Sequence, residues 1–236
     1  VLIARSDGQV VADVRPLFRW MPLLLIFLVA ALTMRQWSEE QRSGTQEMLL
    51  TLPVRPARLV IGKFLAVMTM VLVALILTLP LPLTVASLGN LDWGPVLGGY
   101  LAALLLAAAY SAIGLFVSSR TDNQIVALIL TVLLAGLFFL IGAGGVLDFV
   151  GGGAADLFRA IGTSSRFESI ERGVLDLRDL VYYLSLTGIF LMLNVHSLER
   201  KRWSTGETTR AYRRAQSITT WLVVGNLILI NVWIYP

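Results

Sequence analysis

The sequence predicts an all-α membrane protein that crosses the bilayer about six times. Of the 236 residues, 56% are hydrophobic and only 14% are charged, and the mean hydropathy is +0.76. A soluble domain of this length normally carries about 25% charged residues. The charged residues of this chain gather in short stretches between long apolar runs. Most of the chain is therefore expected to lie in lipid rather than in water.

Six apolar segments account for this class. A membrane-crossing helix needs about 20 mainly apolar residues, because the hydrocarbon core is roughly 30 Å thick. Five segments reach this length: 64–88, 93–119, 125–147, 180–198 and 218–236. The sixth, 20–34, is shorter and lies between Arg19 and Arg35, whose long side chains can extend to the membrane surface. Buried helices of a soluble core are the alternative, but all six segments would then have to be misread together.

Lys and Arg residues are unevenly divided between the two sets of connecting segments. Twelve of them fall in 35–63, 120–124 and 199–217. Seven fall in 1–19, 89–92 and 148–179. Positive residues concentrate on the cytoplasmic side of a membrane, so the first set is predicted to be cytoplasmic. Because this orientation puts Val1 outside, we expect one further helix before Val1 in the full-length protein.

The cytoplasmic segment 37–58 predicts a short helix at the membrane surface. Ser43 and Gln46 have the spacing of a capping box, which starts a helix, and Gly44 allows a bend before it. Pro53 ends the helix by disfavouring the helical conformation of the residue before it. An apolar face is expected from the spacing of Thr45, Met48, Leu49 and Leu52. The helix either lies passively at the interface or docks in a partner's groove.

Prolines and glycines mark further features of the chain. Pro56 suits the first position of the helix that follows the surface segment, and Pro80 with Pro82 is expected to kink that helix near its outer end. In the outer segment 148–179, two short amphipathic helices are expected, at 154–161 and 167–177. They would cap the outer mouth of the bundle, although their mixed charges also fit an ordinary solvated face.

Chemistry-bearing motifs are absent from the sequence. Gly62-Lys63 lacks the upstream glycine and the following Ser or Thr of a phosphate-binding loop, so no ATP site is expected in this chain. There is no cysteine, and the one histidine, His196, is expected to be a packed or interfacial residue rather than a metal ligand. The pI near 9.8 reflects Lys and Arg beside apolar runs, which favours membrane lipid over nucleic acid as the partner. We therefore expect neither an enzyme nor a cofactor site.

The apolar segments also lack charged residues at membrane depth. None occurs within 64–88, 93–119, 125–147 or 180–198. Ion-coupled carriers keep such groups in the membrane to bind the driving ion. If this protein transports a solute, its energy is expected to arrive through a cytoplasmic segment.

Several blocks of residues resemble the permeases of ABC-2-type exporters, and most closely the gliding-motility and copper-reductase-maturation type. The most specific block is Leu32-Thr33-Met34-Arg35, then Glu39-Glu40, Arg42-Ser43-Gly44-Thr45, Glu47, Leu49-Leu50 and Leu52-Pro53-Val54, then Gly62-Lys63-Phe64. Further blocks are Asp92-Trp93-Gly94, Gly114–Ser119 with Asn123-Gln124, and Arg172-Gly173-Val174 with Arg178-Asp179-Leu180. Together they extend over roughly 15–200.

This resemblance implies the membrane part of an exporter with two permease copies and two separate ATPase subunits, which would hold ATP and Mg. It also implies a type V exporter-like fold without its first helix, in a bacterial inner membrane. The resemblance also implies which residues couple the permease to the ATPase: Glu39, Glu40, Arg42, Gly44, Thr45 and Glu47.

The chain is expected to divide into a transmembrane domain, 1–205, and a basic linker with a C-terminal anchor helix, 206–236. The domain includes the coupling loop 37–55 and the outer loop 148–179. The tail departs from the permease pattern and resembles the anchor helix of the auxiliary subunit of gliding-type transporters, so a periplasmic auxiliary domain is an expected partner. The alternative function is a non-transporting or mechanotransmitting scaffold for periplasmic machinery. An intramembrane enzyme is disfavoured, since no polar catalytic cluster lies at membrane depth.

Overall fold

The computed structural model describes residues 2–6, 9–13, 15–89, 91–171, 176–202, 217–218, 220–222 and 225. These residues are helical apart from turns and one small hairpin, so the predicted all-α class is confirmed. The hairpin pairs β1 (Leu2–Ser6) with β2 (Gln9–Asp13) in antiparallel register. It was not predicted, although Asp7-Gly8 separates the two strands in sequence and Asp-Gly favours two-residue hairpin connections.

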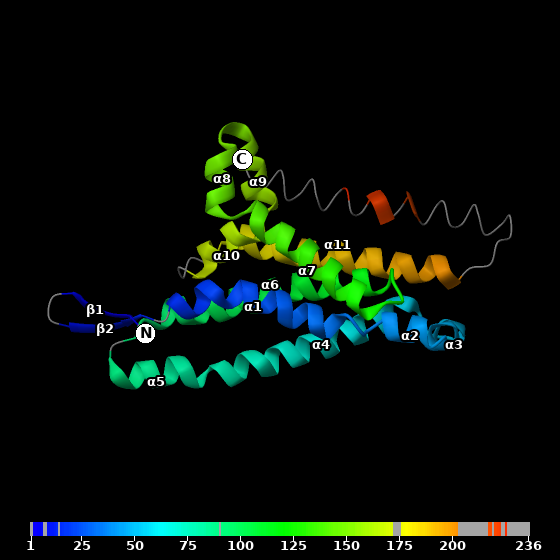
Figure 1. Cartoon of the computed structure of the whole chain (residues 1–236), viewed down its shortest axis with the longest axis horizontal. Helices are drawn as coiled ribbons and strands as arrows, with labels where there is room; N and C mark the ends of the chain where they lie inside the picture. The colour runs from blue at the N-terminus through cyan, green and yellow to red at the C-terminus, as the bar shows by residue number, and fades with distance from the viewer. Residues whose placement is uncertain are drawn as a thin grey trace.

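Five described helices are long and apolar enough to cross a membrane, with α2 counted as an extension of α1 and α5 as an extension of α4. Their main parts are α1 (Arg15–Thr33), α4 (Pro56–Thr78), α6 (Trp93–Ser118), α7 (Gln124–Ile141) and α11 (Leu177–Arg202). They lie side by side and form one bundle (Figure 1). The sixth predicted helix, 218–236, lies almost entirely outside the described residues.

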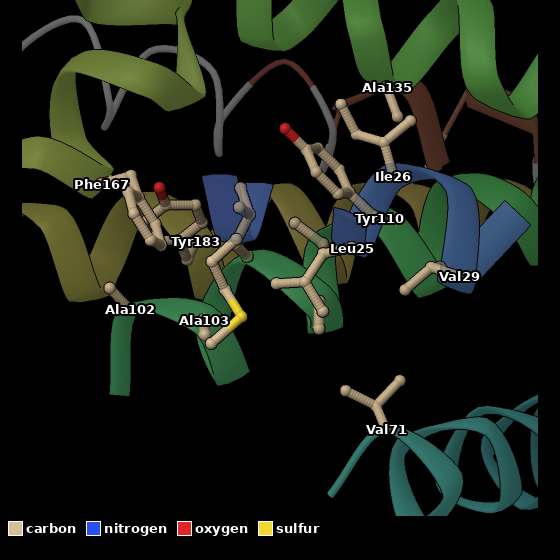
Figure 2. Packing of buried hydrophobic residues seen from close by; sticks show 14 of the residues in the cluster. Leu25, Ile26, Val29, Val71, Ala102, Ala103, Tyr110, Ala135, Phe167 and Tyr183 are labelled. Atoms are coloured by element: carbon tan, nitrogen blue, oxygen red, sulfur yellow. The ribbon is translucent and has the colours of Figure 1, made fainter. Parts of the chain in front are cut away.

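Helix α6 is the centre of the bundle, and it is the most buried of these five helices. Its small residues let neighbouring helices approach closely. A Cβ atom added to Gly99 would lie 2.6 Å from the Phe18 ring of α1, and one added to Gly114 would lie 2.1 Å from Thr33 Oγ1. Figure 2 shows Ala102, Ala103 and Tyr110 of α6 among apolar side chains of the other helices. The small residues of α6 therefore serve packing within this chain.

Gly114→Ala is expected to destabilise the protein by about 1–3 kcal/mol, because the added methyl group overlaps Thr33 and forces α1 away from α6. Gly136→Ala in α7 is the matched control, since nothing lies within 4 Å of a Cβ atom there. It should be neutral or slightly stabilising, because alanine favours a helix over glycine. Thermal unfolding of both variants in detergent measures the difference. Equal melting temperatures would contradict the close α1–α6 contact.

Pro56 and Pro80 lie at helix starts, whereas Pro82, which was predicted to share in the kink, lies inside a regular helix. Pro56 is the first residue of α4, and the helix is interrupted only at Leu79, before α5 (Pro80–Leu88). Proline has no N–H group, so Pro80 cannot continue the hydrogen-bond ladder of α4. Leu79 N–H instead donates to Ile76 O at 3.1 Å, which tightens the turn.

The outer segment differs from its prediction in two places. Helix α7 ends at Ile141 rather than at 147, and a separate helix, α8 (Gly144–Val150), follows. The cause is a close backbone contact, since a Cβ atom on Gly142 would lie 2.9 Å from Gly162 Cα. Helix α9 (Gly152–Ile161) lies where a helix was expected, but α10 (Thr163–Glu171) begins earlier than the predicted 167–177. Thr163 is held at the start of α10 by hydrogen bonds with Tyr110 (3.0 Å) and Tyr183 (2.9 Å).

Candidate functional site

Two short helices lie at one end of the bundle, and together they form the surface hairpin, residues 38–51. They are α2 (Ser38–Arg42) and α3 (Thr45–Thr51), and Gly44 joins them with φ 74°. This left-handed conformation favours glycine, because a Cβ atom adds strain there. The bend expected at Gly44 is therefore confirmed. Helix α3 ends where Leu52 becomes extended before Pro53, as predicted.

The capping box predicted for α3 is wrong. Ser43 ends α2 instead, and its hydroxyl donates to Glu39 O at 2.8 Å and lies 2.9 Å from Thr45 Oγ1. Gly44 is the N-cap of α3, and no side chain caps this helix. Gln46 is buried, and its side-chain Nε2 has no hydrogen-bond partner among the described residues. The Ser and Gln spacing thus located the helix start without identifying the contacts that form it.

Of the four residues of the predicted apolar face of α3, Thr45, Met48 and Leu52 are exposed and Leu49 is half-buried. Met48 is 71% exposed and Leu52 is 40% exposed. Gln46 and Leu50, one turn apart, face inward instead, and Leu50 packs beside Trp37. As a result, α3 presents an outward surface of mixed polarity, formed by Thr45, Glu47, Met48 and Thr51.

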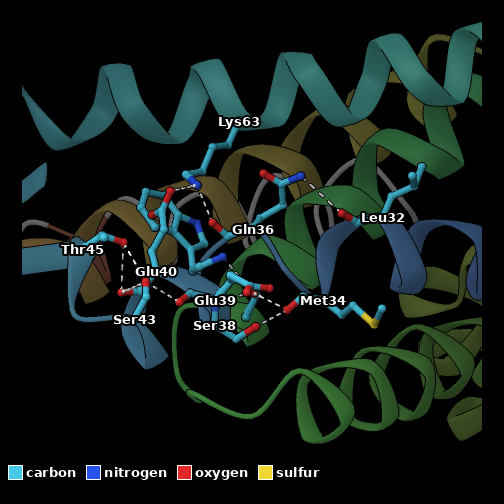
Figure 3. Close-up of polar contacts among 11 residues, drawn as sticks. Leu32, Met34, Gln36, Ser38, Glu39, Glu40, Ser43, Thr45 and Lys63 are labelled. Carbon is cyan, nitrogen blue, oxygen red and sulfur yellow. Dashed lines mark hydrogen bonds and ion pairs between the residues drawn. The ribbon is translucent and has the colours of Figure 1, made fainter.

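Trp37 anchors the hairpin in the bundle. It is fully buried in a small core with Val60 of α4, Leu115 of α6 and Leu198 of α11. Lys63 of α4 lies 4.4 Å from the centre of the Trp37 ring, and its Nζ forms an ion pair with Glu40 at 2.6 Å. Lys63 also donates to the backbone carbonyl of Gln36, and Figure 3 shows this group of contacts. A cation over an indole ring contributes about 0.5–2 kcal/mol.

Polar contacts tie the same hairpin to two further helices, α6 and α7, and a third contact ties α11 to the end of α6. Gln41 Nε2 donates to the carbonyls of Ser118 (3.3 Å) and Ser119 (2.9 Å) at the end of α6. Gln124 at the start of α7 donates to the Glu39 carboxylate. Lys201 near the end of α11 donates to Ser119 O at 2.9 Å. These contacts bring residues of 35–63, 120–124 and 199–202 to the same end of the bundle, as the charge pattern predicts, and residues 203–216 lie outside the described residues.

A polar cleft of about 410 Å³ opens beside the hairpin. It is lined by Gln41, Gly44, Gln46, Glu47, Arg120, Thr121 and Asp122. These side chains can donate and accept hydrogen bonds and can form ion pairs with a polar partner surface. The buried Gln46 amide is the one lining group whose donor nitrogen is buried without a partner in the described part of the chain.

A sequence model of the ABC-2 family transporter proteins matches residues 11–232. The chain belongs to this family. No curated protein and no solved structure gives a significant match to it. As an ABC-2 protein, it is a multi-pass membrane component of an ABC transporter and is not itself the ATPase of that transporter.

The six residues assigned to coupling in this ABC-2 protein fall into two groups. Gly44 and Glu47 line the cleft, and Arg42 and Thr45 are exposed beside it. Glu39 and Glu40 instead hold the hairpin in place, through Gln124 and Lys63 respectively. The sequence reasoning missed the residues that complete the site, which are Gln41, Gln46, Lys63, Ser118, Arg120 and Asp122. Lys63 and Ser118 belonged to recognised blocks, but nothing in those blocks indicated the pairing of Lys63 with Glu40 or the contacts of Ser118 with Trp37 and Ser38.

At the opposite end of the bundle, Arg166 of α10 and Asp179 of α11 form a buried ion pair of 3.1 Å. Arg166 also donates to Ala160 O at 3.1 Å and lies 4.2 Å from the centre of the Tyr182 ring. For these two residues, the expectation of an ordinary solvated face is wrong. Arg159 and Glu168, which line a cavity of about 340 Å³ beside the pair, are exposed.

Proposed function

We propose that this ABC-2 protein is the permease subunit of an ATP-driven exporter, and that a separate ATPase docks on its surface hairpin. The observation that carries the proposal is an outward face of α3 that lies beside a polar cleft and rests on a hairpin tied to α4, α6, α7 and α11. Such a face can enter a groove of the partner by helix docking. Because the hairpin is anchored to four helices, a push on α3 reaches the whole bundle.

The proposed mechanism separates the energy source from the transport path. The partner ATPase binds ATP and Mg, and its closure displaces α3. The ion pair of Lys63 with Glu40 and the burial of Trp37 keep the hairpin from moving independently of the spans. The spans then shift between inward-facing and outward-facing arrangements, each favoured by one state of the ATPase. The uncharged apolar segments agree with energy supplied from outside the membrane.

The finer parts of the proposal rest on the resemblance and the charge pattern. The end that holds the hairpin faces the cytoplasm of a bacterial inner membrane, because Lys and Arg concentrate there. The permease works as a dimer of the gliding-motility and copper-reductase-maturation type, with a periplasmic auxiliary domain.

Glu47→Lys is expected to weaken binding of the co-encoded ATPase by about tenfold, since a reversed charge in a docking cleft loses an attraction and adds a repulsion. Asp156→Lys makes the same charge change at an exposed site on α9, at the opposite end, and should leave binding unchanged. Affinity is measured by co-purification and titration of the ATPase in detergent. Equal binding by the two variants would contradict docking at the hairpin.

Transport itself is tested in proteoliposomes that contain the permease and its ATPase. ATP-dependent movement of a candidate substrate supports the exporter. ATPase binding and stimulation without movement of any offered substrate favours the scaffold.

A further inference from the structure

The helical hydrogen-bond pattern is interrupted between α1 and α2, and a side chain from another helix forms hydrogen bonds to the backbone at this break. In an unbroken α-helix, the N–H groups of Trp37 and Ser38 would bond to carbonyls four residues earlier. Both N–H groups instead donate to Ser118 Oγ of α6, at 3.1 and 3.2 Å. The Ser118 hydroxyl donates in turn to Met34 O at 3.1 Å. One hydroxyl therefore uses its donor and both acceptor positions to bridge the break.

Two other backbone groups at the break also have hydrogen-bond partners. Gln36 N–H donates to Thr33 O at 3.1 Å, and Lys63 donates to Gln36 O. Insertion of a side chain into the helical ladder is a recognised cause of a sharp bend. Ser118 is fully buried, so water does not replace its hydroxyl. The direction of α2 relative to α1 is thus set by a group that belongs to α6.

Ser118 also lies at the end of α6 that accepts hydrogen bonds from neighbouring helices. The last carbonyls of a helix have no partner within the helix. At the end of α6, Gln41 of α2 donates to the carbonyls of Ser118 and Ser119, and Lys201 of α11 donates to Ser119 O. Any displacement of α2 therefore acts on the last turn of α6, the most buried span.

We infer that Ser118 is the positioning residue that transmits movement of the surface hairpin to α6. Without its hydroxyl, the N–H groups of Trp37 and Ser38 return to the carbonyls of Thr33 and Met34, α1 and α2 join into one helix, and α3 changes direction. This inference rests on the proposed docking of an ATPase at the hairpin. It adds the route by which the docking signal enters the core of the bundle.

The neighbouring Ser119 provides a matched control. Both serines are fully buried at the same end of α6. The Ser119 hydroxyl, however, donates to Phe116 O of its own helix at 2.7 Å. Ser119→Ala therefore removes a buried serine hydroxyl without touching the α1–α2 break, whereas Ser118→Ala removes all three bridging bonds.

The first measurement is the direction of the hairpin in the full chain without ATPase. The sequence has no cysteine, so Met48→Cys and Leu97→Cys, at positions 71% and 67% exposed, accept one spin label each. Pulsed EPR then gives the distance between α3 and the far end of α6. Ser118→Ala is expected to shift or broaden the distance distribution, whereas Ser119→Ala and the hydroxyl-retaining Ser118→Thr match the wild type. A Ser118→Ala distribution that superimposes on the wild type overturns the inference.

If Ser118→Ala does not yield folded protein, Ser118→Cys replaces it, because a thiol fills the space but is a weak donor and acceptor. A count of two labels per chain checks that the buried thiol stays unreacted. A shifted or broadened distance distribution for Ser118→Cys supports the inference, and one that superimposes on the wild type overturns it.

The second measurement uses the complex of the unlabelled chain with its co-encoded ATPase. With enough ATPase added to occupy all of the chain, Ser118→Ala is expected to lower the permease-dependent stimulation of ATP hydrolysis by about tenfold. Undiminished stimulation overturns the role in transmission. A wild-type chain that binds no ATPase would instead refute the proposed function, and the distance comparison would still stand.

Discussion

Gly44→Pro is expected to abolish stable binding of the ATPase while leaving the helical bundle folded. Gly44 has φ 74°, and proline fixes φ near −65°, so α2 and α3 cannot keep their present turn. Proline also removes the N–H group that donates to Gln41 O at 3.3 Å. Strain of this kind costs about 1–3 kcal/mol, and more when the turn is lost. Since about 1.4 kcal/mol corresponds to tenfold in affinity, a loss of tenfold or more is expected.

A graded series separates backbone strain from steric overlap at this position. Nothing in the described part of this chain lies within 4 Å of a Cβ atom built on Gly44, so a side chain there affects the conformation of the hairpin through the positive φ. Asparagine tolerates the left-handed region, alanine tolerates it less well, and proline is excluded from it. Binding is therefore expected to fall in the order Gly44→Asn, Gly44→Ala, Gly44→Pro.

The measurements are ATPase affinity by titration in detergent and thermal unfolding of the permease alone. The unfolding temperature should change little, because Gly44 is exposed and lies outside the core of the bundle. Gly44→Pro that binds the ATPase as well as Gly44→Asn would show that the turn between α2 and α3 is not needed for docking.

The spanning helices could be predicted because their signal is local. The run 93–119 is apolar throughout, and α6 ends within one residue of the predicted boundary. The outer end of α7 could not be predicted in this way. The apolar run continues past Ile141, but the backbone turns there because Gly142 contacts Gly162, twenty residues later. Hydropathy predicts the length of an apolar stretch, but it does not predict which distant segment of the backbone packs against that stretch.

The site was predictable in position but not in its contacts. The motif at Gly44, Thr45 and Glu47 located an exposed segment beside the cleft. The periodicity of α3 grouped Met48 with Leu49 and Leu52, but it did not indicate that Gln46 and Leu50 face the bundle, because a short helix with few apolar residues is oriented by its anchor, here Trp37, rather than by its own pattern. Ser118 stands in the block Gly114–Ser119, but that block does not indicate its contacts. Its contacts join residues about 80 positions apart, and a serine near a helix end is common in any sequence.

Arg166→Met is expected to destabilise the protein by about 3–5 kcal/mol. The substitution leaves the Asp179 carboxylate buried without its partner, and an uncompensated buried charge costs far more than an intact ion pair contributes. It also removes the bond to Ala160 O, which holds α10 to the end of α9. Arg178→Met removes an exposed arginine from the same end of α11 and should change stability by no more than about 0.5 kcal/mol.

The double variant Arg166→Met with Asp179→Leu tests whether the unpaired Asp179 charge causes the loss of stability. Replacing a buried ion pair by apolar side chains is often close to neutral, so the double variant should be more stable than Arg166→Met alone. Thermal unfolding of the single, double and control variants in detergent gives the coupling between the two sites. If the two substitutions were additive, the cost of Arg166→Met would lie in its contacts with Ala160 and Tyr182, and the ion pair would hold α10 on α11 only weakly.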